Sequence, residues 1–133
     1  MEFLVEGPPR AKKFIESLLP NMITQLKLTR SRNLVHVMLD SDLQEQGTVV
    51  PFQGLNTFLI VLKPDRNLVN LGVTLAHELI HVAQFAKGIL KVAPKGRLWR
   101  GKFYSNKTPY LYQPWEIQAF AKQELIMRRA IEL

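Results

Sequence analysis

Residues 68 to about 87 constrain the fold of this chain more than any other segment. Their apolar side chains recur at helical spacing: Leu71, Leu75, Leu79, Val82 and Ala86. Gly88 follows where a helix can end. The spacing therefore predicts an amphipathic helix that packs one face against a core. Two histidines and a glutamate interrupt the stretch, so it makes a poor membrane span.

The other periodicities predict helices at both ends of the chain and a small sheet between them. After an irregular N-terminus, Pro8 and Pro9 can open a helix that continues or restarts after Pro20. Alternating and β-branched residues predict strands at Leu34–Leu39, 48–52 and Thr57–Leu62.

Downstream, residues 89–113 predict a long wrapped loop that can include short strands. Residues 116–131 predict a last helix after Pro114. This helix offers Phe120, Leu125, Met127 and Ile131 to the core. The chain is therefore expected to be one α+β domain, residues 1–133.

The composition limits the chemistry available to this domain. The 133 residues include no cysteine, which excludes a disulfide scaffold, a cysteine nucleophile, an iron–sulfur cluster and a thiolate zinc site. Any metal must be held by His, Asp or Glu. The first residues lack the basic start and apolar run of a secretory signal, so a cytoplasmic location is expected.

The charge balance is basic, with 18 Lys and Arg against 11 Asp and Glu, a formal net charge of +7. Such a charge favours polyanions or acidic partners. The basic residues are spread along the chain without a recognised nucleic-acid-binding motif, so a solvated basic surface is favoured over a dedicated groove. Nucleic acid stays a candidate partner, no membrane partner is expected, and the oligomeric state is left open.

The central helix carries the pattern His77-Glu78-Leu79-Ile80-His81, an HExxH motif. Residues four apart lie one turn apart on the same helix face, so both imidazoles can reach one ion. Glu78 projects beside them and suits the role of general base. The competing interpretation, two ordinary polar-face histidines and a solvated glutamate, requires three suitable residues at this spacing by coincidence.

A third metal ligand must come from elsewhere in the chain. The remaining histidine, His36, lies well upstream on a predicted strand. Downstream the candidates are three carboxylates: Glu116, Glu124 and Glu132. Glu116 is the best choice because it falls in the first turn of the last helix, although a carboxylate there also suits the helix dipole.

HELIH at 77–81, followed by Glu116 in PWEIQAFAKQ at 114–123, resembles the gluzincin type of zincin metallopeptidase. The small minigluzincins are the nearest match, and peptidases of the ImmA/IrrE type are more distant relatives. The resemblance implies a zincin-like fold in which His77, His81 and Glu116 bind one zinc ion and Glu78 is the catalytic base. A small residue such as Ala119 would let two helices approach closely. Trp115 stands where larger gluzincins have asparagine.

The same resemblance suggests that Thr57–Leu62 is an edge strand that pairs with an extended peptide, although a buried strand explains its side chains equally well.

The long loop offers groups that could stabilise an oxyanion: Tyr104, Tyr110, Tyr112, Arg97 and Arg100. Tyr110 is preferred because Pro109 restricts it and the ligand helix follows closely. A hydrophobic aromatic cluster is the competing interpretation for each tyrosine.

The expected function is that of a hydrolase, a zinc metalloendopeptidase (protease) acting on a protein or peptide substrate. Two alternatives stay open. One is a non-catalytic binding module stabilised by zinc, and the other is a peptidase that reaches nucleic-acid-associated proteins through its basic surface.

Overall fold

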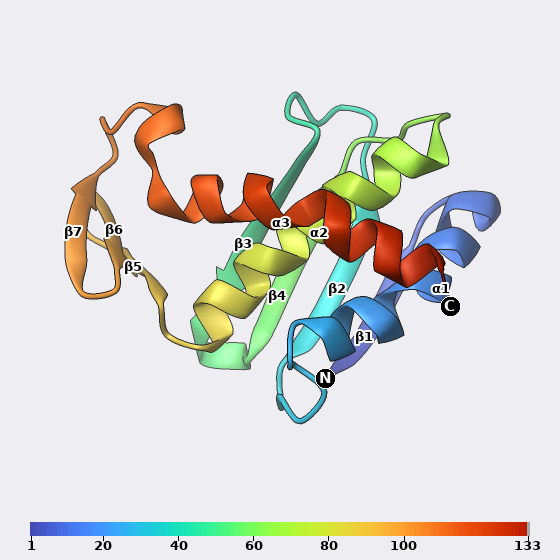
Figure 1. The fold of residues 1–133 in the computed structure, drawn as a ribbon, viewed down its shortest axis with the longest axis horizontal. Helices are drawn as coiled ribbons and strands as arrows, with labels where there is room; N and C mark the ends of the chain where they lie inside the picture. Colours follow the sequence, from blue (N-terminus) through green and yellow to red (C-terminus); the bar gives the residue numbers. More distant parts are fainter. Residues whose placement is uncertain (133) are drawn as a thin grey trace.

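The computed structural model describes residues 1–132, and its main sheet has the strand order β1-β2-β4-β3 (Figure 1). The strands β1 (Glu2–Glu6), β2 (Leu34–Leu39) and β4 (Thr57–Leu62) run parallel to one another. Strand β3 (Gly47–Phe52) pairs antiparallel with β4 and forms an edge of the sheet. A short 3-10 turn, η1 (Gln53–Leu55), connects β3 to β4.

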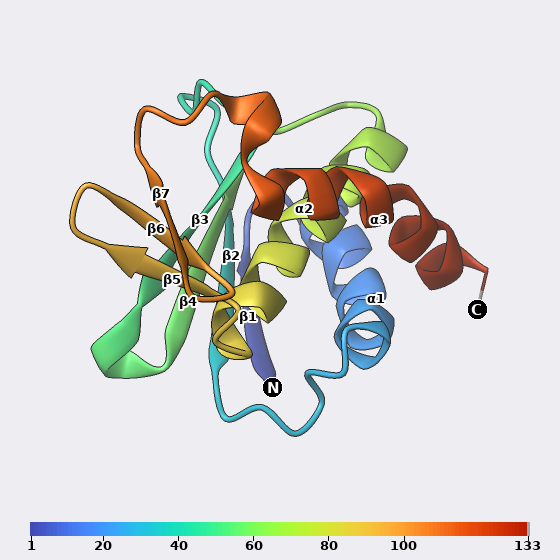
Figure 2. The same ribbon diagram turned by 60° about the vertical axis from the view of Figure 1, so that its left-hand side comes forward.

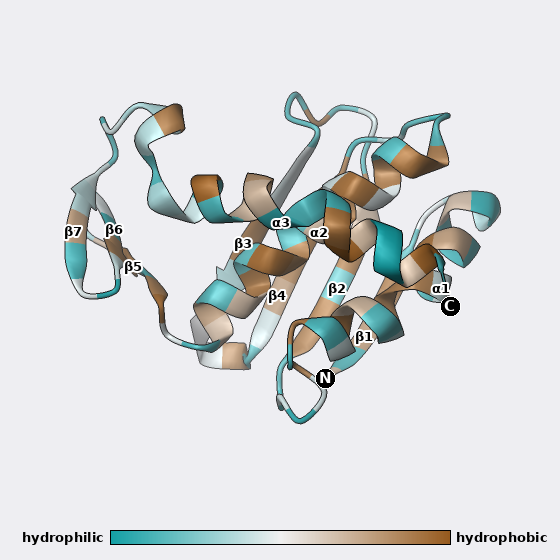
Figure 3. Cartoon of the chain, in the orientation of Figure 1, coloured by the Kyte–Doolittle hydropathy of each residue, from teal (hydrophilic) through white to brown (hydrophobic). Residues whose placement is uncertain are grey.

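Three helices lie on one side of this sheet (Figure 2): α1 (Pro9–Gln25), α2 (Leu68–Ala86) and α3 (Pro114–Ile131). The strand residues that face them are buried, as Val35 and Val37 of β2 and Ile60 of β4 show. In the ribbon coloured by hydropathy, hydrophobic residues concentrate in helices and strands, while the connecting loops are mostly hydrophilic (Figure 3). Burial of this apolar layer is the main force that holds the helices on the sheet.

A second, smaller sheet lies at one end of the molecule and contains β5 (Leu90–Ala93), β6 (Gly96–Trp99) and β7 (Lys102–Ser105). Both pairings are antiparallel, so this segment is a β-meander. Arg100 and Gly101 both have positive φ, as the two-residue turn between β6 and β7 requires. The sheet packs through Leu90 and Trp99 against Trp115 of α3. The 3-10 turn η2 (Tyr110–Tyr112) then leads into α3.

The molecule is therefore α+β, as the sequence predicts. The strands at Leu34–Leu39 and Thr57–Leu62 have the predicted bounds, and α1 passes Pro20 without a break. One expectation about the elements needs correction, because the first residues are a strand, β1, not an irregular segment. In the predicted loop at 89–113, the short strands that it could include are β5, β6 and β7, which pair into a sheet of their own. Both segments contain strands too short for a strong periodic signal.

The expected core face of the last helix is wrong for three of its four residues. Met127 is buried, but Phe120, Leu125 and Ile131 are about half exposed. The buried residues of α3 are Trp115, Ala119, Ile126, Met127 and Ala130, two of them alanines. A small side chain suits Ala119 because α3 packs closely on α2. A Cβ at Gly72 of α2 would collide with the Met127 side chain.

Strand β4 is not the edge strand that the resemblance suggested. It pairs with β2 on one side and β3 on the other, so its backbone groups are already used. The edge position next to α2 belongs to β3. Within residues 1–132, no helix combines the length and the hydropathy needed to cross a bilayer.

Candidate metal centre

Helix α2 holds the HExxH residues rigidly because both of its ends are defined. The side-chain oxygen of Asn67 accepts hydrogen bonds from the backbone N–H groups of Val69 and Asn70 and so caps the first turn. At the other end Gly88 has φ 72°, the left-handed conformation that commonly terminates helices. The motif lies in the second half of this capped helix, and His77, Glu78 and His81 are all buried.

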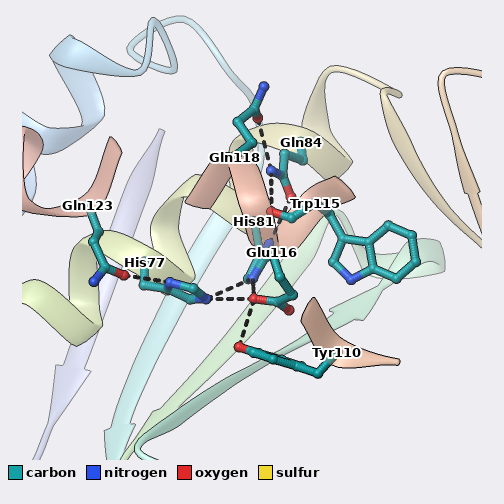
Figure 4. A network of polar contacts seen from close by, with 8 residues as sticks. All are labelled: His77, His81, Gln84, Tyr110, Trp115, Glu116, Gln118 and Gln123. Atoms are coloured by element: carbon teal, nitrogen blue, oxygen red, sulfur yellow. Dashed lines mark hydrogen bonds and ion pairs between the residues drawn. The ribbon is translucent and has the colours of Figure 1, made fainter. Parts of the chain in front are cut away.

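Glutamine amides orient both imidazole rings (Figure 4). The Gln84 amide nitrogen donates to the carbonyl oxygen of Trp115 at 3.1 Å and to Oε1 of Gln118 at 2.9 Å. The Gln84 oxygen must therefore face Nδ1 of His81, 2.8 Å away, and that nitrogen carries the proton. In the neutral ring the lone pair is then on Nε2, the nitrogen available to a metal.

His77 has the same arrangement, with Nδ1 2.7 Å from Oε1 of Gln123 on α3. The Nε2 atoms of the two histidines lie 3.2 Å apart. Oε1 of Glu116 lies 2.8 Å from Nε2 of His77 and 3.1 Å from Nε2 of His81. Three electron-pair donors thus converge on one point. Such a group is mutually repulsive unless a cation or a proton lies among them.

The spacing of these three atoms agrees with a metal site. Tetrahedral zinc, with bonds of about 2.0–2.1 Å, holds its ligand atoms about 3.3 Å apart. A ligand atom from each of His77, Glu78 and His81 also lies within 4.8 Å of the others. The buried His-Glu-His group could therefore hold a metal ion, with the Glu116 carboxylate at hand to complete its coordination.

The packing of α3 on α2 brings Glu116 to this point. Pro114 begins the helix, so Glu116 lies in its first turn. Ala119, one turn further, is completely buried and lets the helices approach. Gln123 lies two turns from Glu116 on the same helix face, which explains why one helix can supply both contacts to His77.

The charges of the site are strongly coupled. Burial alone would raise the pKa of Glu116, but its contacts with His77 and His81 outweigh burial and hold the pKa well below its usual range. Burial alone would lower the pKa of His77, but the contact with Glu116 reverses this and raises it above 6.5. Both shifts show that the site favours positive charge next to the Glu116 carboxylate.

Glu78 lies in a different environment from Glu116. Burial raises the pKa of Glu78, and the nearby His81 and His77 offset this only in part. Its Oε2 atom is buried without a hydrogen-bond partner among the described residues. A carboxylate in this state accepts a proton readily, as a general base near neutral pH must.

The site opens into a cleft of about 540 Å³, and its walls come from both sheets, α2 and α3. Strand β3 contributes Gly47, Thr48 and Val49 to one wall, and Arg97 of β6 lies on another. At Gly47 a Cβ would lie 2.8 Å from a Thr74 methyl group and 3.1 Å from Cγ of Glu78. Glycine therefore lets the edge strand pass directly beside the motif helix.

Tyr110 reaches the site. Its hydroxyl donates a hydrogen bond of 3.0 Å to Oε1 of Glu116 while the side chain is 51% exposed. Burial and the Glu116 charge raise the pKa of this phenol, so it stays a donor across the physiological range. Of the other tyrosines, Tyr104 contacts Trp115 edge to face, and Tyr112 is 72% exposed.

The structure places the other candidate ligands away from the centre. His36 is on the face of the main sheet opposite the helices and contacts Glu6 at 3.5 Å. Glu124 lines a separate cavity beside Arg128, and Glu132 follows the last turn of α3. Arg100 stacks on Trp99 instead of entering the cleft.

Sequence reasoning gave no role to Gln84, Gln123 or Gly47. The spacings were visible in the sequence, because Gln84 follows His81 by three residues and Gln123 follows Glu116 by seven. What the sequence does not show is which helix face each amide joins. For Gly47, the close approach of β3 to α2 is a tertiary feature without a local signal.

No protein-family model, curated protein or solved structure matches this chain.

Proposed function

We propose that this protein is a zinc-dependent metallopeptidase of the zincin type that hydrolyses peptide bonds, with His77, His81 and Glu116 as the ligands of one zinc ion. The observation that carries the proposal is the convergence of two Nε2 lone pairs and one carboxylate oxygen at 2.8–3.2 Å. Imidazole and carboxylate are suitable zinc ligands. The open cleft beside them favours a catalytic centre over a closed structural one.

Bound zinc supplies a Lewis acid that polarises a carbonyl group and lowers the pKa of water. Glu78 takes a proton from the attacking water as the water oxygen bonds to the carbonyl carbon. Glu78 then delivers that proton to the amide nitrogen as the C–N bond breaks, which yields a carboxylic acid and an amine. Tyr110 is positioned to donate a hydrogen bond to developing negative charge beside Glu116.

The exposed edge of β3 is the proposed binding strand for the peptide. Among residues 1–132, β3 pairs with the sheet on one side alone, and its first residues line the cleft together with Glu78. A peptide added to this edge would use backbone hydrogen bonds, which provide affinity with little sequence preference.

The decisive variant is Glu78→Gln, because it removes the base and keeps the three ligands. We expect it to retain zinc and to lose about 100- to 10,000-fold in cleavage of a denatured-protein peptide library read by mass spectrometry. Glu124→Gln removes a carboxylate outside the cleft and is the matched control. Equal cleavage by the Glu78→Gln protein would refute the proposal.

The charge distribution favours a second candidate, a peptidase directed to nucleic-acid-associated proteins. Between Glu78 and Glu116 there is no acidic residue, whereas the following basic ones occur: Lys87, Lys91, Lys95, Arg97, Arg100, Lys102 and Lys107. Most of them lie on or beside the β5–β7 sheet. If this sheet binds phosphates, affinity for a short DNA duplex will fall steeply with salt, and Lys95→Gln with Lys102→Gln will reduce that slope. A slope unchanged by this double variant would exclude this sheet as the contact.

A further inference from the structure

Arg97 is held in a fixed orientation beside the candidate metal centre. Its guanidinium carbon lies 5.8 Å from the centre of the Phe85 ring and 5.5 Å from that of Trp115. The planar, weakly hydrated guanidinium suits such stacking. The side chain is half-buried, and it lines the cleft together with His77 and Glu78.

This cation has no anionic partner in the part of the chain that the structure describes. The ion pairs found among residues 1–132 all join a histidine to Glu6 or Glu116. Glu116, which lines the same cleft, directs Oε1 to His77, His81 and Tyr110. The forked N–H donors of Arg97 are therefore available to a ligand, and their geometry matches a carboxylate.

A small second pocket is lined in part by Arg97. It has a volume of about 160 Å³ and adjoins the main cleft, because Arg97 and Glu116 line both. Trp115 and residues from β7 and the chain after it line the rest: Tyr104, Ser105, Asn106 and Gln113. This pocket is large enough for a carboxylate group and a few atoms beyond it, not for a bulky side chain.

We propose that Arg97 and this pocket form a subsite for a carboxylate of the bound peptide, so that the cleft prefers acidic substrates. The inference rests on the proposed peptidase function and names its substrate class. The carboxylate comes either from an Asp or Glu side chain or from the peptide's C-terminus. The seven basic residues between Glu78 and Glu116, with no acidic residue among them, attract peptides of that charge.

Binding of three dansyl-labelled pentapeptides to the zinc-loaded Glu78→Gln protein tests this subsite without requiring turnover. The first has a central Glu and an amidated C-terminus, the second a central Gln and a free C-terminus, and the third a central Gln and an amidated C-terminus. Energy transfer from tryptophan to dansyl reports binding. We expect the first or the second to bind about tenfold or more tightly than the neutral third.

Adding Arg97→Gln should bring the three affinities within about twofold of one another. Lys91→Gln is the matched control, since it removes an exposed charge of the same meander outside both pockets and should leave the preference intact. If Arg97 only holds Phe85 near Trp115, Arg97→Gln would instead weaken the binding of all three peptides by the same factor. That result would overturn the subsite.

Equal affinities for all three peptides before the Arg97 substitution, or no binding of any peptide, would also overturn the inference. Its failure differs from failure of the proposed function. If the unmodified protein cleaves no peptide but Glu78→Gln keeps an Arg97-dependent charge preference, hydrolysis is refuted and the carboxylate subsite stands. If cleavage depends on Glu78 but the preference for a carboxylate is absent, the carboxylate subsite is refuted and hydrolysis stands.

Discussion

Replacing Gln84 by leucine should weaken metal binding although Gln84 is not a ligand. The side chain is 2% exposed and makes three hydrogen bonds, to His81, to the Trp115 carbonyl and to Gln118. Leucine fills a similar volume but leaves Nδ1–H of His81 unpaired, whereas the Trp115 carbonyl lies in the first turn of α3 and still has an intrahelical partner. At about 1–3 kcal/mol for one unpaired buried group, the loss in unfolding free energy is about 1–3 kcal/mol.

The metal effect is separate from this loss of stability. Without Gln84 nothing fixes the tautomer of His81, so the proton can move to Nε2 and compete with the ion. We expect zinc affinity, measured by competition with a chromophoric chelator, to fall about 10- to 100-fold. Gln118→Ala is the control, because it removes one acceptor of the amide and leaves the contact with His81. Zinc affinity unchanged in a folded Gln84→Leu protein would refute the reasoning.

Three further predictions concern the same centre. Gly47→Ala places a methyl group against Thr74 and Glu78, so hydrolysis should fall while zinc binding persists. The unfolding free energy measured by chemical denaturation should drop by about 1–3 kcal/mol. Normal activity would show that β3 can move away. Because the pKa of His77 is raised, a proton competes with zinc at a higher pH than for an ordinary histidine, so zinc affinity should fall as the pH decreases. Calorimetry that finds no such pH dependence would contradict the assigned ligand. In the metal-free protein, the lowered pKa of Glu116 contributes stability above about pH 4.5. This stability is lost as the pH falls, because the unfolded chain then binds a proton that the folded chain does not. Glu116→Gln should therefore make the unfolding free energy less dependent on pH in the acid range, and an unchanged pH dependence would disprove the coupling.

The parts of the fold that the sequence predicted have strong local signals. Helix α2 and the strands Leu34–Leu39 and Thr57–Leu62 have regular periodicity and clear boundaries, and their bounds agree closely with prediction. The β5–β7 meander has four-residue strands joined by two-residue turns, too short for periodicity to detect. The core face of α3 was predicted wrongly because three of its large apolar residues are about half exposed, whereas two alanines, Ala119 and Ala130, are buried.

In the candidate site, too, local spacing predicts one part, and tertiary packing determines the rest. The spacing of His77 and His81 is local, so a helix model alone places both imidazoles together. Glu116 was one of three downstream carboxylates, and only the packing of α3 on α2 brings it within 3.1 Å of both Nε2 atoms. The orienting amide of Gln84 depends on contacts with α3, and no sequence pattern encodes such a contact.

Metal content of the purified protein tests the central claim most directly. Plasma mass spectrometry after dialysis against zinc should find about one zinc ion per chain in the unmodified protein and in Glu124→Ala. Glu116→Ala should weaken zinc retention, because it removes the oxygen that faces both histidines. No bound zinc in the unmodified protein, or loss of zinc from Glu124→Ala but not from Glu116→Ala, would contradict the proposed metal centre.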